Sequence, residues 1–173
     1  MFCPHCSFDN IAGVDDCESC GQPLVEFDHV GSDLEQAITS QSIGVLNPKQ
    51  PLTVQASMAV RGAVAEMVAR KIGCLLVEEG KQLVGIFTER DVLNKIRVDK
   101  DDQNRPVSDF MTPSPATITK DDSIAYALHA MDLGGYRHMA IVDETGRSTG
   151  IISVRDILRY LYEQFGEVSA QTG

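Results

Sequence analysis

The chain has 173 residues, a net charge of −10, an apolar fraction of 43% and no tryptophan, a composition that predicts a folded globular protein with an aliphatic core. No apolar run approaches the roughly 20 residues that cross a bilayer, and the first residues lack the basic flank and apolar stretch of a secretory signal, so we expect a cytoplasmic protein with no membrane partner. Residues 1–48 hold eight acidic side chains and no Lys or Arg, which makes this region a poor candidate for nucleic-acid binding, and we expect no nucleic-acid partner.

Four of the five cysteines form two C-x-x-C pairs, Cys3–Cys6 and Cys17–Cys20, separated by ten residues. Two such knuckles can direct four thiolates at one ion, and this spacing in a reducing compartment favours metal over two disulfides or four free thiols. Because cysteine fills all four positions, no position is open for a catalytic water, and we predict a structural zinc ion. Iron in a rubredoxin-like site is the alternative, since four thiolates accept either ion.

The same segment resembles the small zinc ribbons written C-P-x-C-x-x-x-N…C-x-x-C-G-x-x-L. Asn10, Gly21 and Leu24 stand at the matching positions, whereas Ser7 stands where those ribbons usually carry glycine. We expect Gly21, which has no Cβ, to let backbone amides approach the sulfurs. The resemblance and the acidic face imply that the ribbon docks a protein partner.

The rest of the chain contains an internal repeat of about 65 residues. Pro51–Val54 matches Pro115–Ile118 at an offset of 64. After a one-residue slip, Leu75–Glu78 matches Ala140–Asp143, and Gly85–Leu93 matches Gly150–Leu158. Two copies indicate a duplicated domain rather than a solenoid.

Each copy alternates strand and helix signals, and the uninterrupted Val, Ile and Leu runs predict sheets covered by helices. In the first copy we expect a strand at Thr53–Val54, a helix over Met58–Arg70, strands over Gly73–Val77 and Leu83–Phe87, and a helix over Glu89–Ile96. In the second copy we expect a helix over Ser123–Leu133, strands over Met139–Val142 and Gly150–Ile152, and a final helix to about Phe165.

The β-α-β-β-α order, the short turn between two apolar strands, the closing G-h-h-[ST]-x-x-D (h, hydrophobic) and the V-x-D-x-M-T element at residues 107–112 resemble CBS domains, which occur as tandem pairs called Bateman modules. The resemblance implies an α/β (α+β) fold in which two tandem CBS repeats pack as a pseudo-symmetric pair behind a small zinc ribbon. The expected divisions are a ribbon at 1–26, a partly helical linker at 27–41, CBS domains at 42–105 and 106–165, and a C-terminal tail at 166–173.

The [ST]-x-x-D steps are Thr88 to Asp91 and Ser153 to Asp156. A carboxylate at this position can accept both hydroxyls of a ribose, while the hydroxyl reaches sugar or phosphate near free backbone amides. The alternative is plain helix capping, because Thr and Ser are good N-caps and Asp three residues on completes a capping arrangement.

The CBS resemblance implies an adenosine-based ligand, such as AMP, ADP, ATP or S-adenosylmethionine, in clefts between the repeats. It assigns ribose and phosphate to the two [ST]-x-x-D steps and the adenine to pairs in each first strand, which are Thr53, Val54, Thr117 and Ile118. Arg137 and His138 precede a core strand where related domains often carry a basic residue that meets phosphate. Their counterpart by sequence is the uncharged Ile72–Gly73, so we expect unequal sites, with the stronger phosphate grip in the second copy.

Three of these residues also have simpler interpretations. His138 can pack at a strand edge without touching a ligand. Arg90 and Arg155 can reach phosphate, or can form ion pairs on a helix surface.

We therefore predict a non-catalytic regulatory module that binds an adenine nucleotide or S-adenosylmethionine and signals to a partner. No nucleophile–base pair, Walker loop or paired carboxylates suggest an enzyme. One alternative is a dimerising scaffold that binds no ligand and recruits a partner through the acidic ribbon, and another is an iron redox protein. Bateman modules commonly pair, so the resemblance also implies a homodimer.

Overall fold

The computed structural model describes residues 3, 6, 8–11, 14, 16–22, 38–97 and 101–171, with side chains to residue 164. The chain divides into two compact units, Met1–Glu35 and Gln36–Gly173. The division falls within the expected linker. The capping-box sequence at residues 32–35 lies outside the described residues, and residues 38–40 are helical.

The larger unit contains two sheets. One has the order β1 (Thr53–Gln55), β2 (Cys74–Glu79), β3 (Gln82–Thr88) and β4 (Thr112–Pro113), and the other has the order β5 (Thr117–Ile118), β6 (His138–Val142) and β7 (Ser148–Ser153). In both sheets the first pairing is parallel and the second is antiparallel. The expected β-α-β-β-α order of each repeat is confirmed.

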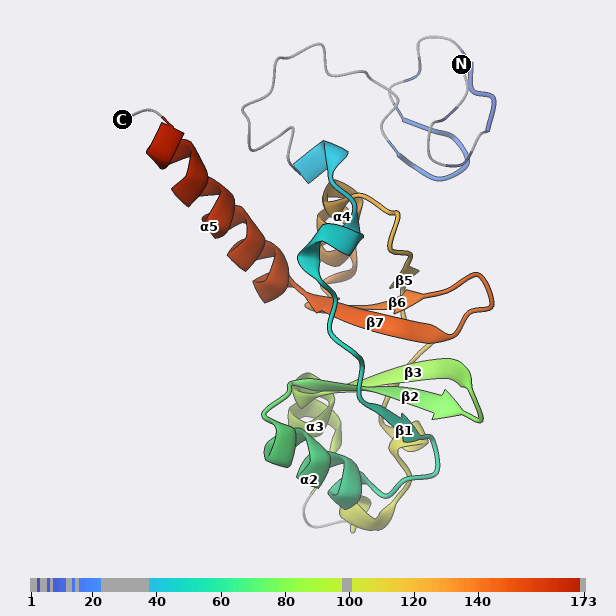
Figure 1. Ribbon diagram of the computed structural model, residues 1–173. Helices are drawn as coiled ribbons and strands as arrows, with labels where there is room; N and C mark the ends of the chain where they lie inside the picture. The colour runs from blue at the N-terminus through green and yellow to red at the C-terminus, as the bar shows by residue number, and fades with distance from the viewer. Residues whose placement is uncertain are drawn as a thin grey trace. The chain divides into compact units, whose positions relative to one another are not determined.

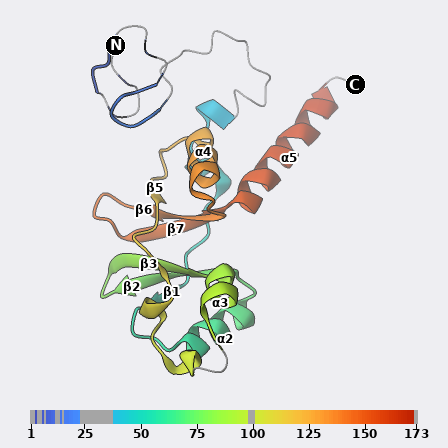
Figure 2. The same cartoon turned by 180° about the vertical axis from the view of Figure 1, so that it is seen from behind.

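The helices lie on the outer sides of the two sheets (Figure 1). They are α2 (Val60–Arg70), α3 (Glu89–Lys95), α4 (Ile124–Gly134) and α5 (Val154–Gln171), with short 3₁₀ helices η1 (Ile43–Leu46), η3 (Asp102–Asn104) and η4 (Val107–Asp109). Helix α5 continues to Gln171, past the end expected near Phe165. The same layering is visible from behind (Figure 2).

The strands are buried on both faces, which explains their uninterrupted apolar sequences. In β2, Leu75 and Val77 face a core formed with α2, whereas Cys74 and Leu76 face the second sheet, where they meet Ala140. Because side chains alternate along a strand, one apolar run serves both contacts. Burial, with a smaller contribution from Glu89, raises the pKa of the Cys74 thiol to about 12, so this thiol stays neutral.

The segments that lead into each repeat cross to the other repeat. Strand β4, which leads into the second repeat, pairs with β3, and Lys49, which leads into the first repeat, forms a bridge with Ile151 of β7. Gly85 and Gly150 permit these crossings. A Cβ on Gly85 would lie 2.9 Å from Met111 Cγ, and one on Gly150 would lie 3.1 Å from Pro48 Cβ.

The strand registers place the one-residue slip between the repeats differently from the sequence comparison. Thr53 pairs with Leu76 and Thr117 pairs with Ala140, so the offset of 64 persists into β2 and β6. It becomes 65 only after the turns, because Ile86 and Ile151 face these same two residues. The expected slip before the strand was therefore wrong, since strand pairing rather than residue similarity decides the equivalence.

Candidate functional site

The first [ST]-x-x-D step, at the junction of β3 and α3, is a capping box with a buried carboxylate. Asp91 Oδ2 accepts hydrogen bonds from Thr88 N (2.8 Å) and Thr88 Oγ1 (2.6 Å), while Thr88 Oγ1 accepts one from Asp91 N (3.3 Å). Asp91 Oδ1 lies 2.7 Å from Lys95 Nζ and accepts a hydrogen bond from Thr112 Oγ1 (3.3 Å). Burial opposes ionisation, but the bonds from Lys95 and Thr88 outweigh it and lower the pKa of Asp91.

The second step, at the junction of β7 and α5, has the same capping geometry with different cations. Asp156 Oδ2 accepts hydrogen bonds from Ser153 N (2.9 Å) and Ser153 Oγ (2.6 Å). Asp156 Oδ1 pairs with Lys49 Nζ at 3.2 Å and with Arg159 Nη2. Burial opposes ionisation here too, and the bonds from Ser153 and Lys49 outweigh it, so the pKa of Asp156 is lowered. The capping interpretation thus holds in both repeats, and each carboxylate also faces a cavity.

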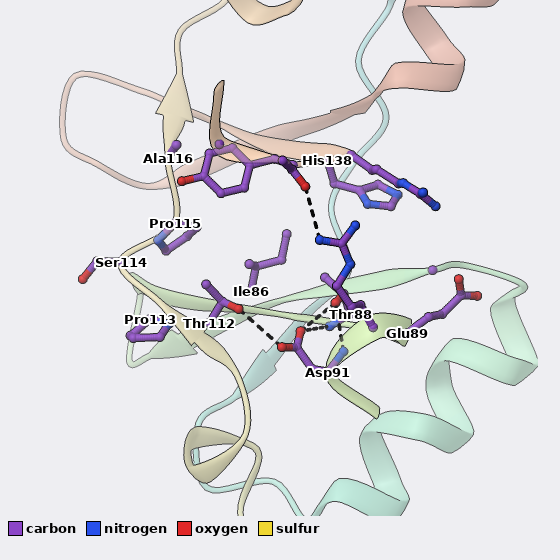
Figure 3. A pocket seen from close by; sticks show the side chains of 16 residues that line it. Ile86, Thr88, Glu89, Asp91, Thr112, Pro113, Ser114, Pro115, Ala116 and His138 are labelled. Atoms are coloured by element: carbon purple, nitrogen blue, oxygen red, sulfur yellow. Dashed lines mark hydrogen bonds between the residues drawn. The ribbon is translucent and has the colours of Figure 1, made fainter. Parts of the chain in front are cut away.

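The first pocket, defined by Thr88 and Asp91, is a cavity of about 370 Å³ between the two repeats (Figure 3). Its walls come from the β3–α3 junction, the segment from β4 towards β5, and the end of α4 with the start of β6. The lining residues are Gly73, Ile86, Thr88, Glu89, Arg90, Asp91, Thr112, Pro113, Ser114, Pro115, Ala116, Gly134, Gly135, Tyr136, Arg137 and His138.

The second pocket, defined by Ser153 and Asp156, is a larger cavity of about 740 Å³ built from the reciprocal elements. The β7–α5 junction, the segment before β1, and the end of α2 with the start of β2 form its walls. The lining residues are Lys49, Gln50, Pro51, Leu52, Arg70, Lys71, Ile72, Gly73, Cys74, His138, Ile151, Ile152, Ser153, Arg155, Asp156 and Arg159.

The structure brings together most of the predicted nucleotide-binding residues, although not as the sequence arranged them. Arg137 lines the first pocket, opposite the Thr88–Asp91 step, rather than joining Ser153 and Asp156. His138 lines both pockets. Arg90 lies in the first pocket, where its Nη1 donates to Gly135 O at 3.3 Å, and Arg155 lies in the second.

The four residues expected around adenine do not line either pocket in the described part of the chain. Val54 and Ile118 are buried in the cores beneath the helices, so the alternation of the strand turns them away from the clefts. Thr53 and Thr117 are exposed outside both cavities. The positions just before each strand line the cavities instead, and these are Pro51, Leu52, Pro115 and Ala116.

Four basic residues of the second pocket were not predicted, namely Lys49, Arg70, Lys71 and Arg159. They come from the crossing segment, the end of α2 and the second turn of α5, which are distant in sequence from Ser153 and Asp156. No local pattern in the sequence connects them with that step.

His138 is a partly buried histidine at the start of β6. Desolvation lowers its pKa, with Arg137 and Arg155 acting in the same direction and the carboxylates of Glu89 and Asp156 opposing it. Because the net shift is downward from an ordinary value of about 6.5, the ring is neutral at pH 7. His138 therefore lies at the strand edge, as one interpretation expected, and also lines the pockets, as the other requires.

The four cysteines of the smaller unit form a cluster that can hold a metal ion, with their sulfur atoms within 4.8 Å of one another. Cys3 Sγ lies 3.7 Å from Cys20 Sγ, and Cys6 Sγ lies 3.6 Å from Cys17 Sγ. Four sulfurs at about 2.3 Å from a central ion in a tetrahedron are about 3.8 Å apart. The cluster therefore has the dimensions of a tetrathiolate site.

The backbone of the ribbon supports this cluster. Asn10 is buried, its Oδ1 accepts a hydrogen bond from Glu18 N (2.9 Å) and its Nδ2 donates to Phe8 O (3.0 Å), so it ties the two knuckles together. Gly21 has a φ of +68° with open space at its Cβ position, so its conformation, not the expected close approach, requires glycine.

The thiols also differ in their readiness to ionise. Burial opposes ionisation of Cys17, but hydrogen bonds from the Cys20 and Ser19 backbones outweigh it and lower its pKa to about 6. Desolvation, followed by the neighbouring sulfurs, raises the pKa of Cys20 to about 12. A cation at the centre would offset the repulsion between the thiolates.

Among the described residues, no helix is both long and apolar enough to cross a membrane.

Comparison with known proteins places the fold in a family. The CBS domain model matches residues 45–98 and 107–163, and the chain therefore belongs to the CBS-domain family. An uncharacterized 17.7 kDa protein of Acidianus ambivalens is 33% identical over 119 residues, which are 66% of this chain and 71% of that protein. The chain spans only 31% and 49% of two further curated relatives.

Solved structures share the fold. The CBS domain protein PAE2072 from Pyrobaculum aerophilum, complexed with AMP, has a TM-score of 0.62 at 22% identity, covering 71% of this chain and 99% of its own. The CBS domain pair of MJ0100, in complex with 5′-methylthioadenosine and S-adenosyl-L-methionine, has a TM-score of 0.63 at 22% identity, covering 69% and 98%. The predicted tandem CBS fold is thereby confirmed.

Proposed function

We propose that the chain is a regulatory module that binds adenosine-containing ligands in its two pockets and conveys their presence to a partner. One observation carries this proposal: two reciprocal cavities lie between the repeats, each with an [ST]-x-x-D carboxylate at its wall, buried in the first and partly buried in the second. The AMP and S-adenosylmethionine complexes of PAE2072 and MJ0100 support the ligand class.

Ligand binding requires each aspartate to exchange one set of partners for another. Oδ2 of Asp91 and of Asp156 caps its helix, while Oδ1 contacts Lys95 and Thr112 in one pocket and Lys49 and Arg159 in the other. Ribose hydroxyls replace these contacts at Oδ1, and the released cations turn towards phosphate. Tyr136, Pro115 and Ala116 give the first pocket an apolar wall for a purine ring.

The ligand couples the repeats because each pocket takes its walls from both of them. A molecule bound in the first pocket contacts the β3–α3 junction and the start of β6, so its binding energy stabilises one arrangement of the repeats over others. No chemical step is assigned to the pockets.

Thermal shift with adenosine, AMP, ADP, ATP and S-adenosylmethionine tests this proposal. A ligand that binds the native state at 100 times its dissociation constant stabilises it by about 2.7 kcal/mol, which is readily measured. The shift should shrink when Asp91→Asn and Asp156→Asn are combined, and the exposed Glu144→Gln should leave it unchanged. If no ligand raises the melting temperature, or the double variant responds fully, the binding function is refuted and the ligand-free scaffold replaces it.

We also propose that the four-cysteine cluster holds a structural zinc ion, with iron as the alternative, and that the ribbon docks a protein partner. Cys3, Cys6, Cys17 and Cys20 hold the ion, which supplies folding energy to a unit whose described residues form only a small apolar cluster. Metal analysis of protein purified without added metal should give one zinc per chain. A red protein containing iron would favour the redox alternative.

A homodimer in the cytoplasm completes the proposal. Val68 of α2 and Leu93 of α3 are 73% and 82% exposed beside an apolar groove, and Leu158, the counterpart of Leu93, is 57% exposed on α5. Apolar side chains grouped on helices in this way suit an interface. Sedimentation equilibrium should give twice the chain mass, and Leu93→Glu with Leu158→Glu should give the monomer.

A further inference from the structure

The two pockets have the same architecture but differ in charge. In the first pocket, Arg90 and Arg137 are balanced by Glu89 and Asp91. The second pocket carries one carboxylate, that of Asp156, against five basic residues: Lys49, Arg70, Lys71, Arg155 and Arg159. With His138 neutral, the lining residues alone give a formal balance of zero in the first pocket and +4 in the second. Lys95, which pairs with Asp91, brings the first to +1, and Glu66, which pairs with Arg70, brings the second to +3.

We infer that the second pocket selects ligands with two or more phosphates, whereas the first takes ligands with one phosphate or none. This inference rests on the proposed binding function. It assigns nucleoside di- and triphosphates to the Ser153–Asp156 pocket, and nucleoside monophosphates or uncharged adenosine derivatives to the Thr88–Asp91 pocket.

The internal repeat shows that the excess charge is specific to one pocket. Lys49 bridges to Ile151 where Thr112 pairs with Ile86, so Lys49 occupies the position of Thr112. The lysine places Nζ 3.2 Å from Asp156 Oδ1, and the threonine places Oγ1 3.3 Å from Asp91 Oδ1. At this position the second pocket has a cation and the first has a neutral hydroxyl. The other contact of each Oδ1 atom is a cation in both pockets, Lys95 beside Asp91 and Arg159 beside Asp156.

Most of the other differences have the same sign. At an offset of 65, Arg159 stands where the first repeat has Asn94, and the acidic Glu89 of the first pocket corresponds to Val154. At the offset of 64 that holds up to β2, Arg70 and Lys71 correspond to Gly134 and Gly135. Two differences have the opposite sign: Arg137 of the first pocket stands opposite Gly73, and Lys95, which pairs with Asp91, stands where the second repeat has Tyr160.

Lys71 adds an independent observation, because its backbone conformation is one that glycine favours. It caps α2 with φ 54° and ψ 46°, and its counterpart Gly135 caps α4 with φ 63° and ψ 26°. The left-handed region is unfavourable for residues with a Cβ, and helix ends of this form usually carry glycine. A lysine thus lines the second pocket at a position whose backbone conformation favours glycine.

Five basic groups around one cavity repel each other, and Asp156 alone cannot balance the two that contact it. A polyphosphate relieves this repulsion and can accept hydrogen bonds from several of them at once. In the first pocket, Lys95 pairs with Asp91, Glu89 opposes each additional phosphate charge, and Arg90 and Arg137 are the lining cations, so affinity there should not rise beyond one phosphate.

Isothermal titration of the full chain with adenosine, AMP, ADP, ATP and inorganic tripolyphosphate at 0.15 M salt tests the inference. The repeat itself supplies the substitutions: Lys49→Thr and Arg159→Asn introduce the residue types of Thr112 and Asn94, which the first repeat has at the matching positions. The double variant should bind ATP about tenfold more weakly, or about threefold for each exposed charge removed, with less than a threefold change for AMP. Lys81→Thr, which removes an exposed lysine outside both pockets, should change neither affinity by more than about twofold.

Lys71→Gly separates binding from folding. It should weaken ATP binding about threefold while the melting temperature stays equal or rises, because glycine relieves the left-handed cap. A variant that only damaged the fold would lower both quantities.

The outcomes also separate this inference from the binding function on which it rests. ATP binding no tighter than AMP, or an equal loss for AMP and ATP in the double variant, overturns the selectivity and leaves adenosine binding intact. Tripolyphosphate binding that depends on Lys49 and Arg159, with no binding of any adenosine ligand, overturns the proposed nucleotide function. No binding of any probe overturns both.

Discussion

Replacing Asp91 by alanine should destabilise the larger unit much more than the equivalent change at Asp156. Both aspartates cap a helix, a role worth about 1 kcal/mol. They differ in their surroundings: the Asp91 side chain is 6% exposed, whereas Asp156 is 12% exposed and pairs with Lys49 and Arg159, which are 67% and 56% exposed.

The magnitude follows from these partners. Beyond the cap, Asp91 loses charge-assisted interactions at a buried carboxylate with Thr112 and Lys95, worth about 2 kcal/mol. The exposed pairs of Asp156 are worth less than about 1 kcal/mol together. We therefore expect losses of about 3 kcal/mol for Asp91→Ala and about 1.5 kcal/mol for Asp156→Ala. At about 3 °C per kcal/mol for a unit of this size, the melting temperature should fall by about 9 °C and about 4 °C.

Circular dichroism at 222 nm is the suitable assay, because the described helices belong to the larger unit. The sign of the pH dependence gives a second check. The pKa of Asp91 is lowered in the folded state, so its contribution is present above the unfolded value of about 3.9 and is lost as pH falls. The gap between the wild type and Asp91→Ala should narrow below pH 4. Equal losses for the two variants at pH 7, or a larger loss for Asp156→Ala, would refute this reasoning.

Three further predictions concern other parts of the chain. The pKa of His138 is lowered in the folded state, so the unfolded state binds the proton first and the free energy of unfolding falls as pH drops below about 6.5. Urea titrations at pH 7 and 5.5 should show a smaller fall in this free energy for His138→Asn than for the wild type. Gly85→Ala should lower the free energy of unfolding by about 2 kcal/mol, because the new Cβ would clash with Met111. Gly62→Ala in α2 should raise it by about 0.5–1 kcal/mol, because its Cβ meets only Met58 at 3.5 Å and alanine favours the helix. Equal effects of the two variants would contradict the crossing described above. Cys17→Ser should abolish metal binding and leave the helical melting transition unchanged, and a coupled loss would contradict the division into two units.

The sequence predicted the order of elements well, because each strand carries a short apolar run and each helix an amphipathic pattern. Helix α2 was expected from Met58 and begins at Val60, and β2 was expected to end at Val77 and ends at Glu79. Such ends depend on caps and on the pairing of neighbouring strands, which local patterns define poorly. The four metal-cluster cysteines were predictable for a different reason, since their spacing is local.

The composition of the pockets was less predictable, because it depends on which segments cross between the repeats. Lys49 reaches Asp156 across 107 residues of sequence, and no local pattern indicates that contact. Because the slip was placed before β2, Arg137 was matched with Ile72 rather than Gly73. The correspondence between Lys71 and Gly135 was missed for the same reason. We expected stronger phosphate binding in the second copy because of Arg137 and His138. Arg137 lies in the first pocket, so it cannot be the reason for stronger binding in the second.

Isothermal titration of AMP into the full-length protein at pH 7 is the most direct test of the central claim that the CBS pair binds adenosine-containing ligands between its repeats. We predict saturable binding in the wild type and a loss of at least tenfold in affinity when Asp91→Asn and Asp156→Asn are combined, with the helical content retained. An absence of binding heat for AMP, ATP and S-adenosylmethionine in a folded wild-type protein, or an unchanged affinity in the folded double variant, would contradict the claim.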